Sequence, residues 1–107
     1  MGADQVLMVY ITASNREEAE RLADAMVEAR VAACVNILGA IRSVYRWSGK
    51  VERGDEVVMI AKTTRDVYPQ LEQLVRERHS YECPCIVAVP VENGHAEFLA
   101  WVKRQVG

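Results

Sequence analysis

The chain has 107 residues, of which half are apolar and 26% are charged, and its formal net charge at pH 7 is −2. This length is typical of one domain, and the composition is that of an ordinary globular protein. A slightly negative net charge does not suggest the clustered basic surface that dedicated nucleic-acid binders use. No apolar run approaches the ~20 residues of a membrane-spanning helix. We therefore expect a single domain over residues 1–107, with neither nucleic acid nor membrane as a partner.

The start of the chain and its cysteines bear on the expected compartment. Residues 1–4 lack the basic stretch of a secretory signal, and the apolar run over residues 6–11 is too short for one. Three cysteines are an odd number and do not suggest a disulfide framework. These features predict a cytoplasmic protein.

The first predicted elements are a strand and an amphipathic helix. Residues 6–13 are apolar up to Thr12, which is typical of a strand buried on both faces. Ser14 and Glu17 match a capping box, in which the two residues bond each other's backbone amides. Apolar residues then recur at helical spacing with charged residues opposite, which predicts a helix over residues 15–30.

Residues 41–64 predict one long β-hairpin, because β-branched and aromatic residues flank a break at residues 48–49, where Ser-Gly favours a tight turn. An incoming strand over residues 33–47 would span roughly 45–50 Å at ~3.3 Å per residue. A domain of this size has a radius of gyration of only about 13 Å. The hairpin must therefore bend near Gly39 or project from the domain, and residues 53–55 are expected to form a second break, a bulge or a bend.

The remaining predicted elements are a helix, a strand and a last helix. Thr64 or Asp66 could cap the helix, with Pro69 in its first turn. Residues 85–91 are typical of a strand, and the last helix should start near His95. The order β-α-β-β-α-β plus a C-terminal helix predicts a ferredoxin-like α+β domain, in which two helices cover one face of an antiparallel sheet.

The predicted sheet carries apolar side chains on both of its faces. In residues 6–11, both alternating sets of side chains are apolar, and the strand over residues 85–91 has the same property. Two helices can cover only one face, and a large apolar patch on the other is typical of an interaction surface. We therefore expect a homo-oligomer, with the projecting hairpin suited to contacting another subunit.

Five short motifs occur in order along the chain, namely Ala32-Ala33-Cys34-Val35-Asn36-Ile37, Ser43-Val44-Tyr45-Arg46-Trp47-Ser48-Gly49-Lys50, Lys62-Thr63-Thr64, His79-Ser80-Tyr81-Glu82 and Leu99-Ala100-Trp101. Together they resemble the CutA family of divalent-cation tolerance proteins, and the resemblance runs from about Val6 to Val102. It implies a ferredoxin-like fold and a homotrimer in which long hairpins extend onto neighbouring subunits, with an overall shape similar to PII signalling trimers. It also implies an association with tolerance to copper and other divalent ions, and no well-established catalytic activity.

Cys83-Pro84-Cys85 is the sharpest candidate for metal chemistry. Residues two apart in an extended segment face the same way, and thiolates favour soft ions such as Cu(I) or Zn(II). His79 could supply an imidazole, so the predicted metal site is His79, Cys83 and Cys85, with copper or another divalent ion and no required cofactor. The alternative is that both cysteines are small packed residues. The family commonly has a carboxylate at the position of Cys85, and the thiol discussed for copper near the end of its first strand is replaced here by Ile11.

Tyr45 and Trp47 alternate on one face of the predicted hairpin, which suits packing between subunits. The resemblance to the family implies a second interpretation, an inter-subunit pocket for an anionic ligand, lined by Tyr45, Trp47, Tyr81 and Trp101 with Lys62 as the charged partner. No nucleophile–base pair and no phosphate-binding glycine loop is visible, so an enzyme has the least support. The sequence favours a trimeric, non-enzymatic metal-tolerance protein, and a PII-like module that binds a small anion is the alternative.

Overall fold

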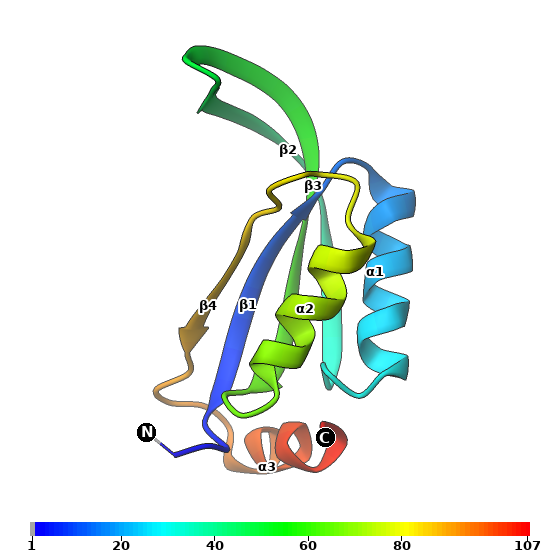
Figure 1. Cartoon of the computed structure of the whole chain (residues 1–107). Coiled ribbons are helices and arrows are strands. Elements are labelled where there is room, and N and C mark those ends of the chain that lie inside the picture. Colours follow the sequence, from blue (N-terminus) through cyan, green and yellow to red (C-terminus); the bar gives the residue numbers. More distant parts are fainter. Residues whose placement is uncertain (1) are drawn as a thin grey trace.

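The structure, a computed structural model, describes residues 2–107, which form an antiparallel four-stranded sheet with three helices (Figure 1). The strand order is β2-β3-β1-β4, and each neighbouring pair is antiparallel. The elements are β1 (Val6–Ala13), α1 (Arg16–Glu28), β2 (Cys34–Trp47), β3 (Lys50–Thr64), α2 (Tyr68–Arg78), β4 (Ile86–Pro90) and α3 (Ala96–Gln105). This order confirms the ferredoxin-like α+β prediction with its C-terminal helix.

The main core lies between one face of the sheet and the helices α1 and α2. Its members have almost no solvent exposure, because alternate residues of β1 and β3 meet the apolar stripes of both helices. The largest of them are Ile11, Leu22, Met26, Met59 and Leu71. No helix within residues 2–107 has the length and apolar character needed to cross a membrane.

The other face of the sheet, which we call the open face, remains exposed along much of its length. Tyr10 of β1 is 39% exposed, and Val87 and Val89 of β4 are 54% and 57% exposed. The helix α3 packs only at one end of the sheet, where Val102 forms a small buried cluster with Val6. The prediction that two helices would leave one apolar face uncovered is therefore confirmed for this chain.

The β2–β3 hairpin projects from the sheet as a bent arm (Figure 1). The strand β1 pairs only with residues 57–64 of β3, so the hairpin over residues 41–56, here called the arm, extends beyond it. Ser48 and Gly49 both have positive φ, at 52° and 78°, which closes the predicted tight turn. A β-bulge precedes Gly39, whose φ of 113° confirms the predicted bend. The second break, predicted at residues 53–55 as a bulge or bend, is not a bulge, because pairing with β2 continues there without a register shift.

The start of α1 differs from the predicted capping box by one residue. Asn15 is the N-cap, and its side-chain oxygen accepts a hydrogen bond from the Glu18 amide at 2.8 Å. Glu18 takes the inward position, 2% exposed, and its carboxylate accepts hydrogen bonds from Ser14. The Ser14–Glu17 prediction was therefore wrong, because tertiary burial selects Glu18 instead of the solvent-facing Glu17.

The second helix begins without the predicted side-chain cap. Val67 is the N-cap, and the Thr64 hydroxyl donates to Asp66 Oδ1 at 2.6 Å instead of capping α2. Pro69 lies in the first turn as predicted, where its missing N–H costs no helical hydrogen bond.

Candidate functional site

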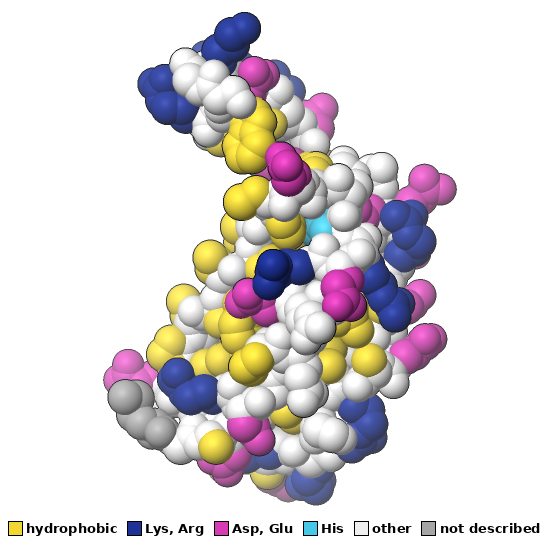
Figure 2. Space-filling view, viewed as in Figure 1, with side chains coloured by type: hydrophobic (Ala, Val, Ile, Leu, Met, Phe, Trp, Pro, Cys, Tyr) yellow, Lys and Arg dark blue, Asp and Glu magenta, His cyan; other side chains and the backbone are white. Residues whose placement is uncertain are grey.

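An open groove of about 670 Å³ lies beneath the arm. Its walls come from three segments that are distant in sequence, namely the concave side of the arm, the end of β1 and the connection over residues 81–85 that follows α2. Figure 2 shows the molecule hollowed below the arm, with hydrophobic side chains bordering the hollow. The bend at Gly39 directs the arm over this groove, so the hairpin geometry creates the site.

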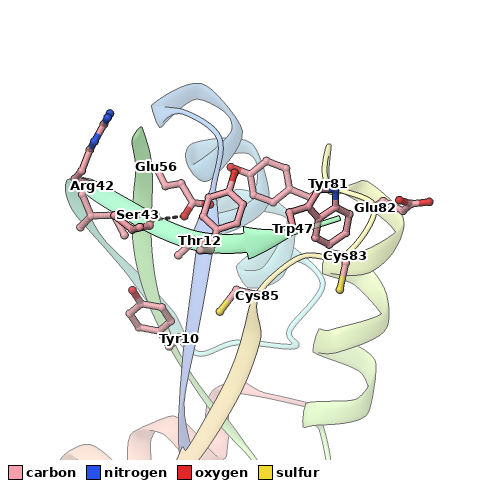
Figure 3. Close-up of a pocket in the computed structure, with 13 residues that line it drawn as sticks. Tyr10, Thr12, Arg42, Ser43, Trp47, Glu56, Tyr81, Glu82, Cys83 and Cys85 are labelled. Atoms are coloured by element: carbon pink, nitrogen blue, oxygen red, sulfur yellow. Dashed lines mark hydrogen bonds between the residues drawn. The ribbon is translucent and has the colours of Figure 1, made fainter. Parts of the chain in front are cut away.

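The groove brings together five of the eight residues predicted to bind metal or ligand. Tyr45 and Trp47 line it from the arm, and Tyr81, Cys83 and Cys85 line it from the connection after α2 (Figure 3). This grouping could not be derived from the spacing of the residues, because they lie in two segments separated by β3 and α2.

Two predicted ligand-binding residues lie elsewhere. Lys62 is on β3 and donates a hydrogen bond to the side-chain oxygen of Asn36 on β2. Trp101 is on α3, where its ring lies 5.7 Å from that of Phe98 and packs against the small cluster at the end of the sheet. Neither residue lines the groove, so the anionic ligand predicted there lacks its charged partner within this chain.

His79 has a fully buried side chain, and both of its ring nitrogens have partners. Its Nε2 lies 2.7 Å from the Thr12 carbonyl oxygen, and its Nδ1 accepts a hydrogen bond from the Tyr81 N–H at 3.0 Å. These partners favour the tautomer with its proton on Nε2. Within this chain the ring positions Tyr81, whose centroid lies 4.7 Å away, and offers no free nitrogen to a metal ion.

Glu18 is a buried carboxylate beside His79. Its oxygens accept hydrogen bonds from the amide and hydroxyl of Ser14 at 2.9 and 2.8 Å, and from those of Ser80 at 2.7 and 3.0 Å. Burial acts to raise the pKa of Glu18, but these four hydrogen bonds outweigh it and lower the pKa to about 2. Glu18 therefore stays ionised and ties α1 to the segment that leads into the groove.

Glu56 connects the arm to the groove wall. The Ser43 hydroxyl donates to Glu56 Oε1 at 2.5 Å, which fixes the carboxylate on the concave side of the arm. Burial, followed by interaction with the Glu56 carboxylate, raises the pKa of Tyr81 well above its usual value. Tyr81 therefore keeps its hydroxyl proton and can donate a hydrogen bond to the Glu56 carboxylate.

The two groove cysteines are free and exposed. Cys83 lies in a bend and β4 begins only at Ile86, so the segment is not the continuous extended chain that was expected. In Figure 3 the two sulfur atoms do not point toward each other. Burial, and then the charge of Glu56, raise the pKa of Cys85, which opposes the thiolate form.

Metal ligands do not converge within one copy of the chain. In residues 2–107, no three His, Cys, Asp or Glu side chains are arranged to hold a metal ion. The groove does combine the thiols of Cys83 and Cys85 with the carboxylates of Glu56 and Glu82. One chain can therefore supply a partial set of donors but no closed coordination site.

Sequence reasoning did not single out Glu18 or Ser80 as part of the site. The one available signal was the position of Glu18 in the first helical turn, three residues after a competent N-cap at Asn15. The partners of these residues lie up to 62 positions away, so spacing could not reveal them.

Relatives of the chain occur in more than one compartment. A solved structure described as the periplasmic divalent cation tolerance protein CutA from Archaeoglobus fulgidus matches with a TM-score of 0.91 at 43% identity, covering 95% of this chain and 99% of that chain. The Arabidopsis thaliana protein named "Protein CutA, chloroplastic" is 39% identical over 98 residues, which are 92% of this chain and 54% of the relative. These findings overturn the predicted cytoplasmic location, because the folded domain is compatible with other compartments and does not itself encode one.

Comparison with known proteins confirms the resemblance seen in the motifs. The family model described as CutA1 divalent ion tolerance protein matches residues 7–105. The Archaeoglobus fulgidus protein named "Divalent-cation tolerance protein CutA" is 45% identical over 98 residues, which are 92% of this chain and 95% of that protein. The solved structure of the divalent cation tolerance protein Cut A1 from Thermus thermophilus has a TM-score of 0.93 at 40% identity and covers 95% of this chain and 99% of that chain. The chain therefore belongs to the CutA1 family of divalent ion tolerance proteins.

Proposed function

We propose that this chain acts in tolerance to divalent cations as a non-catalytic homotrimer that binds copper or a related ion weakly near its subunit contacts. Family membership supports the link to divalent cations. The observation that carries the metal proposal is the groove beneath the arm, where two thiols and two carboxylates are among the lining residues. Weak binding follows because one chain offers only part of a coordination shell, which water or a second copy must complete.

The open face supports self-association. Val87 and Val89 of β4 are more than half exposed, and Tyr10 of the adjacent strand extends the same apolar surface. Exposed apolar patches of this kind are typical of interfaces between subunits. We expect a trimer by light scattering at micromolar concentration, and a monomer would contradict this part of the proposal.

The charges around the groove favour a cation over an anion. Glu56 and Glu82 line the groove. The Arg42 guanidinium forms a salt bridge with Asp55 at 3.1 Å, and Lys62 lies outside the groove. This composition supports the metal-ion proposal more than the PII-like alternative, in which a small anion would have to approach two carboxylates.

Calorimetric titration of the assembled protein tests metal binding. Zn(II), Cu(II) and, without oxygen, Cu(I) are titrated into the wild type and into the Cys83→Ser/Cys85→Ser double variant, with Cys34→Ser as the matched control because Cys34 lies on β2 away from the groove. We expect saturable binding that the double variant loses and the control keeps. Unchanged metal uptake by the double variant would remove the thiols from the proposal, and saturable binding of nucleotides without any metal response would favour the anionic alternative.

A further inference from the structure

The connection between β4 and α3 contains an asparagine followed by a glycine, Asn93-Gly94, outside any helix or strand. Asn93 lies in a bend of the chain, and both residues are exposed. Figure 1 shows this connection and α3 at the end of the sheet opposite the arm. Asn93 belongs neither to the arm nor to the strands of the open face, so its setting differs from that of the groove residues.

Packing favours a glycine after Asn93. A Cβ built at Gly94 would lie 3.2–3.3 Å from three side-chain atoms of Leu99, closer than most Cβ contacts in proteins. Leu99 packs in turn against the small cluster of Val6 and Val102, which holds α3 to the sheet. The close contact between Gly94 and α3 therefore disfavours a larger residue, although glycine makes the preceding asparagine chemically labile.

An asparagine followed by glycine can lose its side-chain amide without a catalyst. The backbone nitrogen of the glycine attacks the side-chain carbonyl carbon, the proton of that nitrogen leaves with the departing ammonia, and a cyclic succinimide forms. Water then opens the ring at either carbonyl carbon and yields aspartate or isoaspartate. Glycine favours the attack because no Cβ crowds its nitrogen and because its backbone reaches conformations closed to other residues.

The local structure at Asn93 leaves this attack open. The Gly94 N–H, which must lose its proton, donates to no backbone carbonyl oxygen within residues 2–107. Neither Asn93 nor Gly94 is held in the ladder of a strand or in the turns of a helix. The backbone can therefore bring the Gly94 nitrogen to the side chain of Asn93 without breaking regular structure.

The two other asparagines of the chain, Asn15 and Asn36, provide internal references. Asn15 is the N-cap of α1, and its side-chain oxygen accepts a hydrogen bond from the Glu18 amide at 2.8 Å. Asn36 lies in β2, where its side-chain oxygen accepts a hydrogen bond from Lys62. Both side chains are engaged by the fold, and both precede a residue with a Cβ, so the same attack is hindered at these positions.

We propose that Asn93 is a site of spontaneous deamidation and that its isoaspartate product loosens the attachment of α3 to the sheet. Isoaspartate routes the main chain through the side chain and so adds a carbon atom to it, two residues before His95, the N-cap of α3. This change displaces Gly94 from Leu99, whose amide donates the first hydrogen bond of the helix to the His95 carbonyl oxygen at 3.0 Å. The product is an intact chain with a less protected last helix.

Peptide mapping by mass spectrometry tests the modification. The assembled wild type is incubated at mildly alkaline pH, well below its unfolding temperature, and digested with trypsin, which releases residues 79–103 with Asn93 among them. Deamidation should be roughly tenfold faster or more at Asn93 than at Asn15 or Asn36, which corresponds to a barrier difference of about 1.4 kcal/mol. Electron-transfer fragmentation distinguishes isoaspartate from aspartate. An Asn93 amide that persists as long as that of Asn15 would overturn the proposal, whether its own contacts or a neighbouring subunit protect it.

Hydrogen exchange tests the effect on α3. The amides of α3, including that of Leu99, should exchange about fivefold to tenfold faster in aged than in fresh wild type, while those of α1 keep their rate. Asn93→Gln is the matched control, because its longer side chain closes the ring slowly, and it should keep full protection after the same incubation.

Freshly prepared Asn93→Asp separates the added charge from the altered main chain. It carries the same new carboxylate on an ordinary backbone and should protect α3 as the wild type does. Fast exchange of α3 in this variant would contradict the role given to isoaspartate. Equal exchange of α3 in fresh and aged wild type, once isoaspartate has formed, would likewise overturn the loosening of the helix.

Discussion

Ser80 donates two hydrogen bonds to Glu18 across 62 positions of sequence, from its amide to Oε2 at 2.7 Å and from its hydroxyl to Oε1 at 3.0 Å. Glu18 belongs to the first turn of α1, and Ser80 begins the connection that forms one wall of the groove. The shape of the groove therefore depends on the buried, ionised carboxylate of Glu18, which also stabilises the fold.

Replacing Glu18 with Gln should lower the free energy of unfolding by about 2–4 kcal/mol. The carboxylate now accepts hydrogen bonds from four donors, and the NH₂ group of Gln would face some of these donors without being able to accept from them. Urea unfolding at fixed protein concentration measures this. Glu17→Gln is the control, since Glu17 is exposed in the same helical turn and should change stability by less than about 0.5 kcal/mol. Equal stability of the two variants would contradict the expectation.

The stability of the protein should fall in acid through Glu18. Its pKa is about 2 in the folded protein, against an ordinary value of 4.5. A carboxylate with a lowered folded-state pKa contributes fully above the unfolded value, and the contribution is lost as pH falls from 4.5 through 2. The difference corresponds to about 3 kcal/mol. Urea midpoints between pH 5 and 2 should decline more steeply for wild type than for Glu18→Gln, and parallel declines would disprove this linkage.

His79 should carry its proton on Nε2. The Tyr81 amide donates to Nδ1 at 3.0 Å, so that nitrogen must accept, and Nε2 lies 2.7 Å from the Thr12 carbonyl oxygen. Long-range ¹H–¹⁵N NMR spectra distinguish the two tautomers. His95, whose side chain is 74% exposed, serves as the solvent-accessible reference. A proton found on Nδ1 of His79 would require a different arrangement of the groove wall.

Gly39→Ala should destabilise the protein by about 1–3 kcal/mol, because φ at this position is 113°, a region that residues with a Cβ rarely adopt. Gly54→Ala is a matched control on the paired strand. A Cβ at either glycine would meet no atom within 4 Å, and only Gly39 has a positive φ. The control should therefore stay within about 0.5 kcal/mol of wild type in thermal or urea unfolding. Equal losses at the two glycines would contradict the expectation that backbone strain at Gly39 sets the cost.

Metal binding that involves Cys85 should strengthen as pH rises. Burial and the charge of Glu56 raise the pKa of this thiol, and a thiol must release its proton to bind a metal ion. We expect Zn(II) affinity to increase by up to about tenfold per pH unit between pH 6.5 and 8.5, with part of this dependence lost in Glu56→Gln. A pH-independent affinity would exclude Cys85 as a ligand.

The sequence alone determined the elements of this protein and their order, because those signals are local. A continuous apolar run marked β1, helical spacing marked α1, and Ser48-Gly49 supplied the positive φ angles of the turn. The length of the hairpin against the size of the domain required it to bend or to project, and the structure shows a bulge at Gly39 and an arm that extends beyond β1. The five motifs identified the family from the same local information.

Only the tertiary structure decided which side chains meet. The pairing of β3 with β1 and the path of the chain after α2 place Tyr81 beside Glu56, leave Lys62 on the sheet and bury His79 against Thr12. Burial also chose Glu18 over Glu17, although both carboxylates follow a competent N-cap residue. These outcomes depend on distances between segments far apart in the chain, and no local spacing encodes them.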